Sequence, residues 1–136
     1  MANYQGAFFD LPMTASGDLG DYQYHFVQCA NTPGRVLLST GASGPMPLGI
    51  LQNDPKNLEE ATVRIWGTSK IYISGSVALK YGDLLSSMST GHAELTSGSR
   101  AAQGISLEDV ARSDTTAIYG EMLLFPVTTN VTDNTP

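Results

Sequence analysis

The stretch Glu60-Ala-Thr-Val-Arg-Ile-Trp-Gly67 carries the clearest structural pattern in the chain. Within it, apolar residues alternate with Thr62, Arg64 and Trp66, which is a period of two. Successive side chains of a β-strand point to opposite faces of a sheet, so this alternation is typical of a strand with one face on a core. The stretch therefore predicts a β-strand and favours a β-rich fold.

Similar short segments lie on both sides of this stretch. The expected strands cover residues 21–30, 36–39, 47–51, 71–74, 92–95, 104–107 and 119–125. Turn signals such as Asn31-Thr-Pro-Gly34 separate them about every 8–12 residues. This spacing predicts a mostly β protein, with a small β-barrel or β-sandwich body. Residues 107–112 are compatible with either a helical turn capped by Ser106 or a loop.

The chain of 136 residues fits one domain with additions at both ends. Residues 1–20 are expected to form an extended N-terminal arm, because Gly6, Pro12 and two later glycines interrupt any helix. Residues 21–126 are expected to form the β-rich body. The polar segment 127–136 is expected to be a flexible C-terminal tail.

Composition and charge exclude several classes of function. The net charge is −6 and the seven basic residues are scattered, so neither nucleic acid nor an anionic membrane is an expected partner. No apolar run approaches the roughly 20 residues that span a bilayer. Met1-Ala-Asn-Tyr-Gln5 lacks the pattern of a signal peptide. The lone Cys29 forms no intrachain disulfide, which suits a reducing cytoplasm.

Few residues have the spacing that catalysis or metal binding needs. His25 and His92 are far apart in sequence, and neither has a Cys or another His nearby, so no zinc site is expected. His25 is expected to face solvent, and Cys29 to be a buried, inert thiol. The carboxylates are scattered singly. The sequence thus predicts no cofactor, no metal and no enzymatic activity.

A short repeat links two of the expected strands. Leu48-Gly-Ile-Leu-Gln-Asn-Asp54 resembles Gln103-Gly-Ile-Ser-Leu-Glu-Asp109, and both place Gly-Ile at the start of a strand. Glycine allows close approach of a neighbouring backbone. Two structurally related strands and chance similarity both remain open.

Five stretches follow one another along the chain as a Gly-Ile strand, a strand that ends in Gly, a Gly-Asp turn, a second Gly-Ile strand and a final apolar strand. They are Pro47-Leu-Gly-Ile-Leu-Gln-Asn-Asp-Pro55, Glu60-Ala-Thr-Val-Arg-Ile-Trp-Gly67, Tyr81-Gly-Asp-Leu-Leu85, Gly104-Ile-Ser-Leu-Glu-Asp109 and Tyr119-Gly-Glu-Met-Leu-Leu-Phe125. In this order the chain resembles the head-decoration, or capsid cement, proteins of tailed bacteriophages, over residues 36–126. The resemblance implies a homotrimer that binds the major capsid protein and stabilises capsomer junctions. It also implies a place on the outer capsid surface of the virion, synthesis in the host cytoplasm, and no catalysis.

The expected capsid-binding residues lie in the arm, and they are Tyr4, Phe8, Phe9, Leu11 and Met13. Large apolar side chains in a segment without regular structure must cover something, and a capsid surface is the predicted partner. The alternative is that the arm folds back onto its own body or trimer.

Two other functions remain open on the sequence. A ligand- or glycan-binding β module would use exposed aromatic side chains, for which Trp66 and Tyr72 are candidates. An accessory β-barrel domain of an enzyme would need convergent polar residues, and the sequence shows no such group.

Overall fold

A computed structural model describes residues 7–41, 44–73, 78–96, 102–110 and 118–125 of the chain. These residues contain nine β-strands and no α-helix, which confirms the predicted mostly β fold. The strands are β1 (Phe9–Ala15), β2 (Phe26–Cys29), β3 (Arg35–Leu38), β4 (Pro47–Leu51), β5 (Glu60–Ile73), β6 (Leu84–Ser87), β7 (Ala93–Leu95), β8 (Gly104–Ser106) and β9 (Ile118–Leu124).

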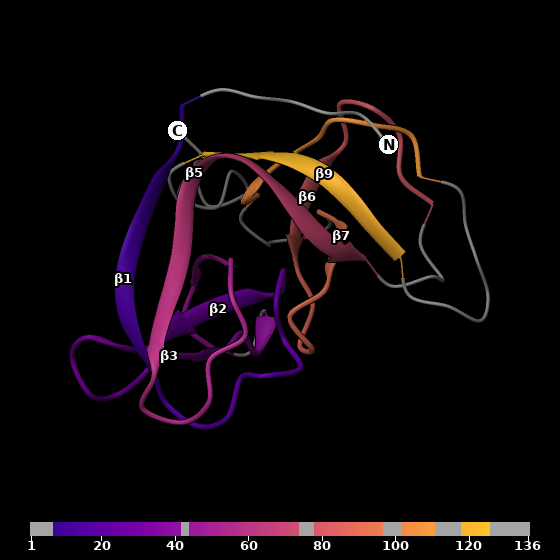
Figure 1. The fold of residues 1–136 in the computed structure, drawn as a ribbon. Helices are drawn as coiled ribbons and strands as arrows, with labels where there is room; N and C mark the ends of the chain where they lie inside the picture. Colours follow the sequence, from indigo (N-terminus) through magenta and orange to yellow (C-terminus); the bar gives the residue numbers. More distant parts are fainter. Residues whose placement is uncertain (1–6, 42–43, 74–77, 97–101, 111–117, 126–136) are drawn as a thin grey trace, which may run out of the picture.

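The strands form two closed circuits that share β5. In the order β1-β3-β2-β4-β5, the first five strands close into a barrel because β1 also pairs with β5. In the order β7-β6-β8-β9, the other four strands start and end on β5, and the contact between β5 and β7 is a single parallel pair, Ile73 with Ala93. In Figure 1, β5 is a long curved strand with β1 along its first half and β9 along its second.

β5 is one strand of 14 residues where the sequence predicts two. Gly67, with φ +102°, lies between the two predicted segments, but pairing continues through it from β1 to β9. Small residues such as Gly67 and Ser69 take inward positions there, so the apolar alternation fades while the strand continues. The even-numbered residues of β5 keep their side chains on the outer face of the sheet.

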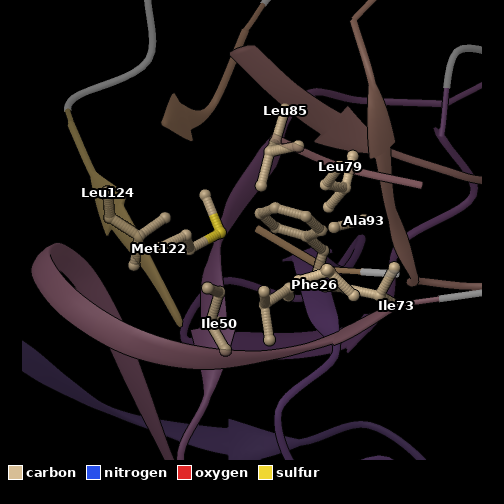
Figure 2. Close-up of a cluster of buried hydrophobic side chains, with 10 residues drawn as sticks. Phe26, Ile50, Ile73, Leu79, Leu85, Ala93, Met122 and Leu124 are labelled. Carbon is tan, nitrogen blue, oxygen red and sulfur yellow. The ribbon is translucent and has the colours of Figure 1, made fainter. Parts of the chain in front are cut away.

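Each circuit has its own core, and β2 and β4 contribute to both. Val27 and Leu51 point into the barrel core, while their neighbours Phe26 and Ile50 point into the core of the second circuit. Figure 2 shows Phe26 at the centre of that second core, close to Met122. Strands buried on both faces need consecutive apolar residues, which explains the Phe-Val and Ile-Leu pairs in these strands.

The start of β2 differs from the prediction. The sequence predicts a strand over 21–30, but β2 begins at Phe26 and residues 22–25 form tight turns. Tyr24 has φ +66°, and the amide of His25 donates to the carbonyl of Tyr22. The alternating tyrosines that suggested a strand instead place their rings against other elements of the fold, as described below.

Residues 9–15, which the sequence places in an extended arm, form a strand of the barrel. β1 pairs antiparallel with β5 from Phe9 to Thr14 and parallel with β3 at Thr14 and Ala15. For these residues the alternative holds, in which the arm folds back onto its own body. Tyr4 and the predicted tail lie outside the described residues.

The segment 107–110 contains no helical turn in the structure. Leu79 and Val110 instead exchange backbone hydrogen bonds in an isolated β-bridge, with N···O distances of 2.9 and 2.8 Å. Residues 111 and 112 of the candidate helix lie outside the described residues. The loop alternative therefore fits the part of the segment that the structure describes.

The Gly-Ile repeat has a shared structural basis. A Cβ on Gly49 would lie 2.1 Å from the carbonyl oxygen of Arg64 on β5, and one on Gly104 would lie 2.2 Å from that of Leu123 on β9. Each glycine thus lets its strand approach its neighbour more closely than any side chain permits. Of the two alternatives, structurally related strands fit the structure, because β4 and β8 each place this glycine against the backbone of a neighbouring strand.

Candidate functional site

Two groups of aromatic side chains stand out in the structure, one at the middle of β5 and one at its end. Within the described ranges, no three His, Cys, Asp or Glu side chains gather as a metal site would require. No helix of the described part of the chain is long and apolar enough to cross a membrane. The two aromatic groups are therefore the candidate functional sites of the described residues.

The first group is an exposed surface where β1 begins beside the middle of β5. Phe9 pairs with Trp66 in register, and the two residues are 48% and 39% exposed. Phe8, the preceding residue, is 54% exposed. We call Phe8, Phe9 and Trp66 the Phe–Trp surface. Exposed aromatic residues close together on β1 and β5 are typical of a surface that binds another protein.

Gly67 lets Phe8 lie across β5. A Cβ at this position would lie 2.7 Å from both the Cβ of Phe8 and the carbonyl oxygen of Ala7. The φ of +102° is also one that residues with side chains rarely adopt. The path of the chain before β1 therefore depends on a glycine in β5.

Arg64 holds Phe8 from the other side. Its Nε and Nη2 donate to the two carboxylate oxygens of Asp10 at 2.8 and 3.1 Å, and its Nη1 donates to the carbonyl of Thr68 at 2.9 Å. The centre of the guanidinium lies 3.9 Å from the centroid of the Phe8 ring. A bidentate ion pair fixes the plane of the guanidinium, and the cation in turn attracts the face of the ring.

Apolar side chains continue from the Phe–Trp surface onto the second circuit. Thr68, two residues after Trp66, pairs with Leu123 on β9. Leu123 pairs with Ile105 on β8, which pairs with Leu84 on β6. Leu84 and Leu123 are exposed and Ile105 is half-buried. We call Leu84, Ile105 and Leu123 the outer row.

Of the five predicted capsid-binding residues, those that the structure describes fall into an exposed pair and a half-buried pair. Phe8 and Phe9 are both exposed, next to the middle of β5. Leu11 and Met13 are half-buried in β1, and Met13 packs against the barrel core. Trp66 was not among the five. Its outward position in the alternating stretch 60–67 was the signal that could have added it.

The second group contains both histidines of the chain. His25 stacks on Tyr72 with ring centroids 4.4 Å apart, and His92 lies 5.1 Å from His25 and 4.6 Å from Tyr72. Tyr22 and Tyr119 approach edge-on, Tyr22 against His25 and Tyr119 against Tyr72. We call this group the ring cluster.

The prediction that His25 faces solvent is wrong, since the residue is 5% exposed. Burial lowers the pKa of His25, against the opposing effect of hydrogen bonds with the backbone of Gln23 and Tyr22. Burial also lowers the pKa of His92, and the nearby His25 lowers it further. Both rings are therefore neutral at pH 7.

Cys29 also differs from the prediction. The sequence predicts a buried thiol, but Cys29 is the exposed last residue of β2, after three buried residues. Strand alternation alone did not reveal this, because β2 is buried on both faces up to its end.

Trp66 and Tyr72, the candidates for glycan binding, belong to different groups. They are six positions apart in one strand, which corresponds to about 20 Å. Trp66 lies beside Phe9, while Tyr72 packs against both histidines. The two rings therefore do not form one platform for a sugar.

No protein-family model and no curated protein sequence matches the chain. Its fold is similar to that of a phage protein. The crystal structure of the head fiber gp8.5 N base in bacteriophage phi29 matches with a TM-score of 0.63. The match covers 91% of this chain and 99% of that chain at 13% sequence identity. At this identity the likeness shows a common fold, over nearly the full length of both chains.

Proposed function

We propose that this protein is a structural component of a phage head that decorates the outer face of the capsid and has no catalytic role. The observation that carries the proposal is the likeness in fold to a head fiber base over 91% of this chain and 99% of the other. The resemblance of its strands and turns to head-decoration proteins supports the same class of function. Fold alone does not set function, so the proposal also needs a surface that fits it.

The Phe–Trp surface is the proposed contact with the major capsid protein. Phe8, Phe9 and Trp66 supply the proposed contact residues. Three half-exposed rings offer on the order of 300 Å² for burial, or about 7 kcal/mol at 25 cal/mol per Å² before the costs of association. Leu11 and Met13 are half-buried, so we assign them to the seating of β1.

We further propose that the chain works as a homotrimer on the virion and is made in the host cytoplasm. The outer row supports self-association, because it leaves apolar side chains exposed on a chain in which only 15% of residues are charged. Light scattering at micromolar concentration is expected to give three times the chain mass. The monomer mass alone, both free and after release from heads, would contradict the trimer.

Binding to heads tests the main proposal. Heads of the phage that encodes the sequence, prepared without this protein, are mixed with the purified chain and sedimented. The chain is expected to cosediment at a saturable number of copies and to raise the temperature at which the heads release DNA. Failure to bind both mature and empty heads would contradict the proposal. A glycan array run with the same sample would reveal the alternative, a sugar-binding module.

A further inference from the structure

The segment 22–26 joins the two circuits of the fold. On the barrel side, the amide of Tyr24 donates to the carbonyl of Leu51 on β4, and the amide of Leu51 donates to the carbonyl of His25. On the other side, the amide of Tyr72 donates to the carbonyl of Tyr24. The amide of Phe26 donates to the carbonyl of Gly91, in the turn before β7. The segment 22–26 is therefore hydrogen-bonded to β4, to the end of β5 and to the turn before β7.

The side chain of His25 occupies the centre of this junction. Its Nδ1 lies 3.1 Å from the carbonyl oxygen of Gln23, which can only accept, so Nδ1 carries the proton and donates it. The ring lies between the face of Tyr72 and the edge of Tyr22. A neutral imidazole fits these surroundings, because one nitrogen is hydrogen-bonded and the faces of the ring meet other rings.

His92 brings a second imidazole to the same place. Its ring contacts both His25 and Tyr72, and its Nδ1 contacts the hydroxyl of Thr90. Gly91, just before it, approaches closely: a Cβ there would lie 2.6 Å from a methyl of Leu38 and 3.2 Å from the Cβ of His25. The turn that carries His92 is thus packed tightly against the junction.

The titratable groups that face the pair are the phenols of Tyr22 and Tyr72. The charged groups on the neighbouring elements are Lys70, Glu121 and Glu94. The Nζ of Lys70 lies 5.6 and 5.9 Å from the rings of Tyr24 and Tyr119. Glu121 pairs in register with Lys70, and Glu94 follows His92 by two residues on β7.

We propose that His25 and His92 act as a pH-sensitive clasp between the two circuits, closed while both rings are neutral and loosened when they are protonated. A proton on either ring places a charge in a site built for a neutral group. A second proton places two like charges in rings about 5 Å apart. The charged pair separates, and the segment 22–26 and the turn that carries His92 move apart with it.

The direction of the effect follows from where the protons bind. Because the pKa of each histidine is lowered in the folded state, the unfolded chain binds protons more readily below its own value of about 6.5. The stability that the neutral pair supports is fully present above about pH 6.5. It is lost as the pH falls from there toward the lowered folded values.

Titration of the full chain by NMR tests the proposal directly, because its two histidines give the only imidazole signals. Both rings are expected to titrate below pH 6.5, with coupled curves, and the amides of residues 22–26 and 88–92 are expected to shift with them. Two independent curves at or above pH 6.5 would overturn the clasp. The readout requires no variant, so it stands even where a substitution prevents folding.

Urea unfolding at pH 7.5 and pH 5.5 measures the same linkage. The unfolding equilibrium constant of the parent is expected to rise about tenfold over this interval, which lies above the range where most carboxylates titrate. In His25→Phe/His92→Phe, which keeps two rings but cannot be protonated, most of that rise is expected to disappear. Tyr81→Phe, at an exposed ring outside the ring cluster, is the control and is expected to keep the rise. An equal rise in the double variant would contradict the proposal.

Discussion

The two halves of β5 carry outward aromatic rings in the same strand pattern, but they end in opposite environments. At its middle, Trp66 stays exposed beside Phe9, and Arg64 fixes the ring of Phe8 from one side. At its end, Tyr72 is covered by the segment that carries His25 and by the turn that carries His92. The strand sets only the direction of each ring. Segments from elsewhere in the chain decide whether that ring becomes part of the structure or remains available to a partner.

The comparison predicts that replacing a buried phenylalanine by alanine lowers the free energy of unfolding much more than replacing an exposed one. Phe26→Ala removes a fully buried ring from the core of the second circuit and is expected to lower the free energy of unfolding by about 3–5 kcal/mol. Phe9→Ala, at a half-exposed ring, is the matched control and is expected to cost less than about 1 kcal/mol. Urea denaturation of both variants measures the difference. Equal losses would mean that Phe9 belongs to the core.

Gly67→Ala is expected to damage the Phe–Trp surface while the ring cluster is preserved. The added Cβ meets Phe8 and needs a φ that alanine avoids, which together cost roughly 1–3 kcal/mol. Phe8 and Ala7 are displaced, since their contacts lie at 2.7 Å. NMR shifts confined to residues near 7–9 and 64–68 would agree. Comparable shifts at His25 and His92 would show that the two halves of β5 are not independent.

A smaller effect is expected from the ion pair under Phe8. Asp10→Asn leaves the guanidinium of Arg64 without its carboxylate partner at a partly exposed site, at a cost of about 1 kcal/mol. The loss is expected to shrink in high salt, because salt screens exposed charges. Thermal unfolding at low and high ionic strength measures both. A loss that does not change with salt would point to packing as its cause.

The smallest expected effect is a gain. Burial and the nearby Glu108 raise the pKa of Glu121, so its ionised form costs stability once the pH exceeds its titration range. Glu121→Gln is expected to raise stability at pH 7 by no more than about 0.5 kcal/mol, with no gain below about pH 4. Thermal unfolding at the two pH values measures it. A loss at pH 7 would show that the pairing with Lys70 outweighs the burial.

Much of the fold follows from local patterns in the sequence, since β4 was predicted with its observed bounds and β3 to within a residue. β1 was missed because the apolar residues of the arm, taken together from Tyr4 to Met13, show no clean period, while Pro12 and the glycines exclude a helix. Proline lacks an N–H but fits a strand position that needs no donor there.

The contacts that make the two aromatic groups lie beyond local patterns. His25 and His92 meet because the segments just before β2 and β7 both reach the end of β5, where the amide of Tyr72 donates to the carbonyl of Tyr24 and Ile73 pairs with Ala93. These contacts join residues far apart in the chain. The alternation of Tyr22, Tyr24 and Phe26 predicted a strand, but of the three only Phe26 lies in one, and the rings of Tyr22 and Tyr24 pack against His25 and Tyr119. Phe8 and Phe9 could be singled out from composition alone. The outward direction of Trp66 follows from the alternation in 60–67, but its place beside Phe9 required the register between β1 and β5.

The most direct test of the central claim is the affinity of Phe8→Ala/Phe9→Ala for phage heads that lack the protein. Tyr119→Ala is the matched control, because it removes an exposed ring from the ring cluster at the end of β5, away from the Phe–Trp surface. The double variant is expected to stay folded and to bind at least tenfold more weakly, a loss of about 1.4 kcal/mol or more, while the control binds like the parent. Full binding by the double variant, or loss of binding in the control alone, would contradict the assignment of the capsid contact to the Phe–Trp surface.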